Sequence, residues 1–426
     1  TATAPGAVEQ QAGVFNKTFF GGITNDMRLN SSFRFVASAF GTSTNFENPF
    51  ITNYEIRNER NAGVRSYVEY SLRKNKIDLT WNTGLEGQWA DQEISNYDNN
   101  AGQQGSLRAA DDISIDQIFY FSRVSANIYQ RLTGEIAVSL NQYKYHFSGS
   151  GTAGSSALRN EWMPRVGASY TFNEHWAIRF VLSRGYSPPS VAEIRPSGGM
   201  INNQLQAEWG WNREAGIRFS TLDNRLQVDG SVFRFDLKNA IVRRTDVEDQ
   251  EYFTNAGGTK QTGVECFVLA WLIPRTQSGV IHGLRLNLSF TYNHFVFDQY
   301  ADASEDYSGN WLTGVPKNVG IGGVTVYLPK KIFFSIQSNL TSRLPLNDAN
   351  SVYTEKYHLL QARIQWQPVQ TPKLRMDAFA GADNLLNQKY SLGNDINAFG
   401  GRYYNAAPER NFYAGIEIGL QYREKE

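Results

Sequence analysis

The chain has 426 residues, which suffice for two or three ordinary domains or for one large architecture. Its 41 basic and 41 acidic residues balance, so no bulk charge favours nucleic acid as a partner. The single cysteine, Cys266, excludes a disulfide within the chain and a cysteine-based metal site. No apolar run approaches the roughly 18 residues that a membrane-spanning helix needs.

Apolar and polar residues alternate with a period of two through nearly the whole sequence, whereas helical periodicity is almost absent. This pattern predicts an all-β protein with about 17 strands. In chain order the predicted strands span 13–22, 27–41, 60–72, 76–90, 114–130, 133–146, 161–172, 174–184, 208–220, 225–242, 258–272, 282–297, 316–328, 331–341, 356–367, 373–384 and 410–422.

The segment 76–89 shows the alternation most clearly. Its odd-numbered residues are mostly apolar and include Trp81 and Trp89, whereas its even-numbered residues include Asp78 and Glu86. Along a strand the two tryptophans would lie roughly 26 Å apart, close to the separation of the two aromatic girdles of a membrane barrel. We therefore expect lipid to contact the odd-numbered face and water in a lumen to contact the even-numbered face.

Two kinds of connection alternate between these strands. The short ones include RKNK, QRLTG and LPKK, and the first of them is predicted at GITND, residues 22–26. Tight turns at one end and long loops at the other are typical of an outer-membrane barrel, with the turns in the periplasm and the loops outside. We therefore predict an antiparallel transmembrane β-barrel. The long connections span 42–59, 91–112, 147–160, 185–208, 243–258, 298–315, 342–356 and 388–409.

Closure of such a barrel requires every strand edge to be paired, and bacterial single-chain barrels use an even number of strands. The predicted number is odd, and the plugged barrels of outer-membrane transporters have 22 strands. We expect residues 1–426 to be a single barrel domain that is N-terminally incomplete, with about five strands absent upstream.

Five stretches, in order along the chain, resemble TonB-dependent outer-membrane receptors, and among them the ferric dicitrate type found in Bacteroidetes. The resemblance runs over essentially the whole chain. The stretches are SRGYSPPSVAEIRPSGG (183–199), LQAEWGWNREAGIR (205–218), EYFTNAGGTKQTGVE (251–265), YHLLQARIQW (357–366) and GADNLLNQKYSLGNDINAFGGRYYNAAPERNFYAGIEIGLQY (381–422).

The resemblance implies a transporter in the outer membrane of a Gram-negative bacterium, surrounded by lipid and lipopolysaccharide. Its ligand would be a ferric chelate, such as ferric citrate or a siderophore, bound by the extracellular loops and the lumen. The TonB–ExbB–ExbD complex would energise uptake through a plug domain and a TonB box, neither of which is present in this sequence. The resemblance implies no intrinsic cofactor.

An anionic chelate needs arginine and amide donors on the long-loop side. For any single arginine or amide on that side, the plainer alternative is that it is solvated or paired with a lumen carboxylate. The same side also carries the donors Asn203, Arg343 and Asn347 and the aromatic residues Tyr186 and Tyr403. The predicted ligand-binding residues are Arg184, Arg195, Asn202, Gln204, Arg243, Arg244, Arg402, Tyr404 and Asn405.

The acidic stretch 298–310 carries Asp298, Asp302, Glu305 and Asp306, whose oxygens would suit calcium. Its spacing lacks the EF-hand pattern, so we predict no metal site. Because no GxSxG elbow occurs, we also predict that the protein is not an enzyme.

Two other functions stay open at this point. The first is a passive porin-like or structural barrel without a plug. The second is a barrel enzyme such as a surface hydrolase, whose catalytic residues need not show in the sequence. Fold alone does not choose among ligands, because one architecture serves many.

Overall fold

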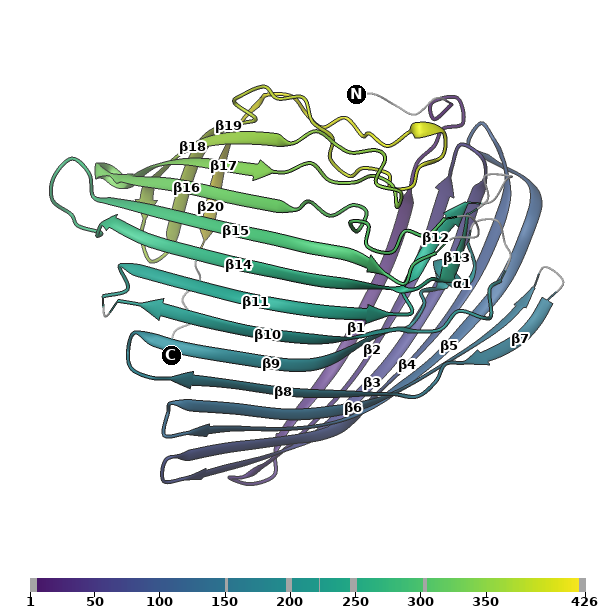
Figure 1. Cartoon of the computed structure of the whole chain (residues 1–426), viewed down its shortest axis with the longest axis horizontal. Helices are drawn as coiled ribbons and strands as arrows, with labels where there is room; N and C mark the ends of the chain where they lie inside the picture. Colours follow the sequence, from purple (N-terminus) through teal and green to yellow (C-terminus); the bar gives the residue numbers. More distant parts are fainter. Residues whose placement is uncertain are drawn as a thin grey trace. The chain divides into compact units, whose positions relative to one another are not determined.

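The computed structural model describes residues 6–149, 152–196, 201–221, 223–245, 251–301 and 305–420 (Figure 1). The chain forms two compact units, which are described separately. Unit 1 comprises 1–169, 181–212 and 236–258, and unit 2 comprises 170–180, 213–235 and 259–426. No described helix is long and apolar enough to cross a membrane.

Unit 1 is a meander in which consecutive strands from β1 to β7 pair antiparallel, and β6 also pairs with β8 (Figure 1). It also holds the helix α1 (Val191–Ile194) and a separate two-stranded ribbon of β12 (Ile241–Thr245) and β13 (Glu251–Asn255). The meander strands are β1 (Phe15–Arg28), β2 (Phe33–Pro49), β3 (Tyr54–Lys74), β4 (Ile77–Asn100), β5 (Gln103–Ile128), β6 (Leu132–Gly149), β7 (Thr152–Ala157) and β8 (Glu161–Thr171).

Unit 2 has the same construction, with consecutive antiparallel pairing from β15 to β20. The strands β9 (Trp176–Ser187), β10 (Glu208–Ser220) and β11 (Leu226–Lys238) contribute to both units. The remaining elements are β14 (Gly258–Ile273), β15 (Gly283–Asp298), β16 (Asn318–Leu328), η1 (Pro329–Lys331), β17 (Ile332–Thr341), β18 (Tyr357–Gln370), β19 (Leu374–Asp383), η2 (Phe399–Gly401) and β20 (Asn411–Leu420).

One face of the unit 1 sheet is apolar and exposed. Trp81 on β4 lies opposite Tyr70 on β3 and Val124 on β5, so these three side chains share a face. On the same face Trp81, Leu85 and Trp89 are 42%, 40% and 41% exposed. Soluble proteins rarely expose contiguous apolar surface of this kind, whereas a lipid-facing barrel wall requires it.

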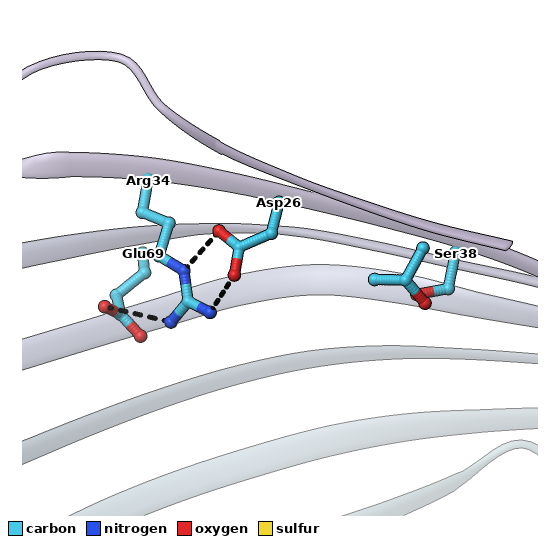
Figure 2. Close-up of polar contacts among 5 residues, drawn as sticks. Asp26, Arg34, Ser38 and Glu69 are labelled. Carbon is cyan, nitrogen blue, oxygen red and sulfur yellow. Dashed lines mark hydrogen bonds and ion pairs between the residues drawn. The ribbon is translucent and has the colours of Figure 1, made fainter. Parts of the chain in front are cut away.

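The other face of the same sheet carries charges that neutralise one another. Arg34 lies between Asp26 and Glu69, and its Nε donates to Asp26 at 2.7 Å (Figure 2). Arg65 and Glu86, which are direct partners across β3 and β4, approach to 3.6 Å. The predicted separation into an apolar odd-numbered face and a polar even-numbered face of segment 76–89 is confirmed.

Carboxylates held between two arginines recur on this charged face. Glu135 on β6 accepts hydrogen bonds from Nε of both Arg123 and Arg165, each at 2.8 Å. Each pair is partly exposed, so each stabilises the fold by about 1 kcal/mol or less. In unit 2 the same arrangement is formed by Arg179, Arg218 and Asp229.

The predicted turn at 22–26 is wrong, because β1 continues through it to Arg28. The turn lies instead at 29–32, where the Asn30 side chain accepts hydrogen bonds from the Ser32 and Phe33 amides at 2.8 and 2.9 Å. The glycine-containing sequence resembled a turn. Its residues are held in the strand by cross-strand contacts such as the Thr24–Ser38 hydroxyl bond of 3.0 Å.

Several predicted long loops are strands for most of their length. The β2–β3 ladder extends to the pair Pro49–Tyr54, and the β4–β5 ladder extends to the pair Asn100–Gln103. Periodicity missed these extensions because a ladder standing in water satisfies its backbone groups without an apolar face. The strands β7, β12 and β13 were missed for the same reason.

The two faces should respond oppositely to a new charge. Leu85→Arg places a cation on the apolar face, halfway between Trp81 and Trp89, and should lower the free energy of unfolding by about 2–4 kcal/mol. Gln88→Arg, on the opposite face of the same strand, should change it by less than about 1 kcal/mol. Urea unfolding in phosphatidylcholine vesicles measures both, and equal losses would contradict the assignment of faces.

Candidate functional site

The residues predicted to bind ligand lie in the connections at the long-loop ends of the strands. In unit 1 three of the six, Arg195, Asn202 and Gln204, belong to the segment 188–207, which the structure describes over 188–196 and 201–207. Pro188 and Pro189 end β9, because neither can donate to a ladder. Ser190 then precedes α1, and the Glu193 carboxylate accepts hydrogen bonds from its amide at 2.7 Å and its hydroxyl at 2.9 Å. The short helix is thereby started at a defined residue.

Arg195 follows this helix and is buried, with only 3% of its surface exposed. Its Nε and Nη2 both lie 2.8 Å from the Asp111 carboxylate, and its Nη1 donates to the Asn96 side chain at 2.5 Å. Ile194 beside it is also fully buried, in a cluster with Ile113 and other residues of the sheet extension. Arg195 therefore anchors the segment to β4 and β5, and its guanidinium is not presented to solvent.

Asn202 ties the same segment to the ribbon. Its side-chain amide donates to the Phe253 carbonyl at 2.8 Å. Asn255 continues the connection, since it accepts from the Gln206 amide at 2.7 Å and donates to the Gln206 carbonyl at 2.8 Å. Gln204, between these contacts, is exposed.

The ribbon positions the two neighbouring arginines of β12. Arg243 lies opposite Phe253, and Arg244 lies opposite Tyr252. Adjacent residues of a strand point to opposite faces, so the two guanidiniums leave the ribbon on different sides. Arg243 is exposed and Arg244 is partly buried.

The Arg184 side chain is bonded within the sheet. One guanidinium nitrogen donates to Glu161 at 2.6 Å and another to the Trp162 carbonyl at 3.1 Å. The guanidinium carbon also lies 4.3 Å from the centre of the Trp209 ring. These contacts connect β9, which carries Arg184, to its neighbours β8 and β10.

In unit 2 the central feature is Asp348, which is buried and accepts from several partners. Tyr300 and Thr313 each donate a hydroxyl to its carboxylate at 2.6 Å, and the Asn397 side chain donates at 3.1 Å. The Asn310 side chain donates to the Asp348 carbonyl at 2.9 Å. We call these five residues the Asp348 knot.

The knot joins three outer connections of unit 2. The structure describes the first over 299–301 and 305–317, the second over 342–356 and the third over 384–410. Asp348 belongs to the middle one, and its amide also donates to the Asn397 side chain at 3.0 Å. Hydrogen bonds to a buried carboxylate are strong and expensive to leave unmade. The three connections are therefore held together in one arrangement.

The predicted residues of unit 2 lie on the third of these connections. Asn405 braces it internally, with its amide donating to the Ser391 hydroxyl at 2.9 Å. The Tyr404 hydroxyl donates to the Tyr353 carbonyl at 3.0 Å, while its ring stays exposed. Arg402 is exposed.

The further donors and aromatics have structural contacts. The Arg343 guanidinium lies 4.7 Å from the Tyr353 ring centre, and Asn347 accepts from the Ser351 amide at 2.9 Å. The Tyr186 hydroxyl is buried and has no hydrogen-bond partner among the described residues. The Asn203 carbonyl accepts from Ser156 at 3.4 Å, and the rings of Tyr403 and Tyr404 are 6.3 Å apart.

The predicted residues thus differ in contacts and exposure within each unit. Arg184, Arg195, Asn202 and Asn405 hold the connections in place. Gln204, Arg243, Arg402 and Tyr404 have exposed side chains, with the Tyr404 hydroxyl bonded to the Tyr353 carbonyl, and Arg244 is partly buried. Sequence reasoning missed Asp348, Asp111 and Asn96, although the Asn-Asp-Ala-Asn run around Asp348 signals a turn rich in side-chain hydrogen bonds.

Two carboxylates of the acidic stretch 298–310 in unit 2 already have partners within the protein. Lys260 donates to Asp298 at 2.8 Å, and Asp306 accepts from the Ser308 amide at 2.9 Å. The Ser308 hydrogen bonds lower the pKa of Asp306 from its usual value. Asp302 lies outside the described residues, and among those described no group of three or more potential metal ligands is found.

Comparison with known proteins gives one family and a set of similar folds. The family model described as "TonB dependent receptor-like, beta-barrel" matches residues 8–385. The ferric citrate transporter FecA, in its unliganded form, is 15% identical with a TM-score of 0.78, covering 95% of this chain and 62% of its own. The siderophore receptor PiuA from Acinetobacter baumannii is 14% identical with a TM-score of 0.75, covering 96% and 65% respectively. The copper transporter OprC is 12% identical with a TM-score of 0.73, covering 94% and 67%.

Arg195→Ala should release the segment 188–207, because it leaves Asp111 buried without its charge partner. We expect a loss of about 3–5 kcal/mol in the local opening free energy. Hydrogen exchange of peptides covering 201–207 and 251–255 measures it. The double variant Arg195→Met with Asp111→Leu removes both charges and should recover most of the protection. Unchanged exchange in the single variant would contradict the anchoring role.

Asp348→Ala should speed amide exchange in all three outer connections of unit 2 together, because it removes the acceptor that they share. The expected loss is about 1–3 kcal/mol per donor left unsatisfied. Asp306→Ala is the matched control, since its contacts stay within one connection. Faster exchange confined to 342–356 would show that the knot does not couple the connections.

Proposed function

Because the chain belongs to the TonB-dependent receptor family, we propose that it is the barrel of a receptor that takes up a ferric chelate such as ferric citrate or a siderophore. TonB-dependent receptors are outer-membrane proteins of Gram-negative bacteria and are transporters rather than enzymes. The predicted barrel, location and non-enzymatic nature are confirmed by this membership. The chelate is the transported ligand and not an intrinsic cofactor.

The observation that carries the proposal is the set of exposed polar and aromatic side chains on anchored outer connections. In unit 1 the anchored segment and the ribbon expose Gln204 and Arg243. In unit 2 the connection tied to the Asp348 knot exposes Arg402 and the ring of Tyr404, whose hydroxyl is bonded to the Tyr353 carbonyl. Guanidinium groups recognise carboxylate and catecholate oxygens through charge-assisted hydrogen bonds, and anchoring lowers the entropy that binding removes.

The structural neighbours share only the fold with this chain, and that is the extent of their support for a ligand of this class. FecA is a ferric citrate transporter and PiuA is a siderophore receptor, whereas OprC transports copper. The chain spans 62% of FecA and 65% of PiuA. Uptake by the whole protein, its energy from the TonB–ExbB–ExbD complex, and its contacts with lipid and lipopolysaccharide are therefore parts of the proposal.

Arg243→Gln and Arg402→Gln should each weaken binding of the chelate by about 10- to 100-fold, the range for one hydrogen bond to a charged group. Isothermal titration of the purified protein with ferric citrate, and with a ferric catecholate, measures the affinity. Arg131→Gln, an exposed arginine in the short turn between β5 and β6, is the control and should bind like the parent.

Two results would count against the proposal. The first is no binding of any ferric chelate by the parent protein, which would favour a porin-like barrel. The second is equal loss in the Arg131→Gln control.

A further inference from the structure

Four side chains form a compact group at the outer end of β15 in unit 2, and we call it the Lys317 cluster. The Lys317 ammonium lies 4.8 Å from the centre of the Trp311 ring and 5.8 Å from that of Tyr292. The His294 ring meets Trp311 edge-on, with ring centres 4.9 Å apart. The cation is therefore held against aromatic rings rather than left on a free side chain.

The cluster lies on the apolar face of the strand. Tyr292 and His294 continue the alternate positions of Leu288 and Phe290, which are 43% and 46% exposed. Trp311 shares this face, because it forms a bridge with Val296, the next alternate residue. The cluster thus stands just above the exposed apolar stripe, at the long-loop end of the strand.

This position corresponds to the outer headgroup level of the membrane. Tyrosine and tryptophan concentrate at membrane–water interfaces, and lysine near an apolar span extends its ammonium to the same level. The family places the protein in the outer membrane, and the long connections mark the outer side. The ammonium is therefore at the height of the headgroups of the outer leaflet.

Lys317 differs in its contacts from the ion-paired cations of unit 2. Lys260 pairs with Asp298, and Arg375 pairs with Asp377. For Lys317, no ion pair is found in the described part of the chain. Together with the exposed His294 ring and the Trp311 indole, it offers hydrogen-bond donors that suit an anion.

We propose that the Lys317 cluster binds a phosphate group on the headgroup of an outer-leaflet lipid. The ammonium supplies the charge, the two aromatic rings fix its position, and His294 adds a further donor. Phosphate matches the cluster because it carries negative charge at the height where the ammonium is held. This inference depends on the outer-membrane location and is independent of the ferric chelate proposed above.

The test uses the protein purified in a neutral detergent and native mass spectrometry with added lipid A. Bisphosphorylated lipid A should bind to the parent protein, and Lys317→Gln should weaken that binding about fivefold, the effect of one basic residue near an anionic membrane surface. Lys331→Gln is the matched control, since Lys331 is exposed in the short turn at the other end of the β16–β17 pair.

Three outcomes would overturn the proposal. Equal loss of binding in Lys317→Gln and Lys331→Gln would show only a general effect of charge. Equal binding of dephosphorylated lipid A would exclude phosphate as the recognised group. Displacement of lipid A by millimolar inorganic phosphate would show a site for the free anion and not for a lipid. A chelate titration that stays unchanged in Lys317→Gln would confirm that the two proposals are separate.

Discussion

The need to satisfy backbone hydrogen bonds in hydrocarbon determines the organisation of this chain. Lipid offers no donors or acceptors, so each strand must pair along its length with a neighbour. Long antiparallel ladders in chain order meet that need. The pleat then separates the side chains into two sets, and their chemistry follows from the solvent that each set meets. Trp81 and Leu85 are on the lipid side, and Glu86 and Arg65 are on the side of the paired charges.

The same constraint explains how far the sequence could predict the fold. Strands that cross lipid were found because apolar alternation is obligatory there, and β17 matches its predicted range to within one residue. The turn at 29–32 was misplaced because a glycine pair suggested an earlier one. The outer halves of β4 and β5 were taken for a loop, because in water a ladder needs no particular pattern of side chains.

The residue types of the candidate site could be predicted, but the bonding partners of each residue could not. Arginines and amides do occur at the outer ends of the strands. Whether a given one meets solvent depends on partners far away in the chain, and Asp111 lies 84 residues from Arg195. Asp348 was missed because its importance comes from donors on two other connections, and neither is marked by local sequence.

The carboxylate of the Asp348 knot is buried, whereas Arg402 and the ring of Tyr404 on one of its connections are exposed. The five residues of the knot keep three connections in place through hydrogen bonds that converge on one buried carboxylate and its backbone carbonyl. A change at an exposed side chain such as the ring of Tyr404 should therefore leave the buried carboxylate and its donors intact, so the chemistry of this surface can vary while the common arrangement of the three connections persists.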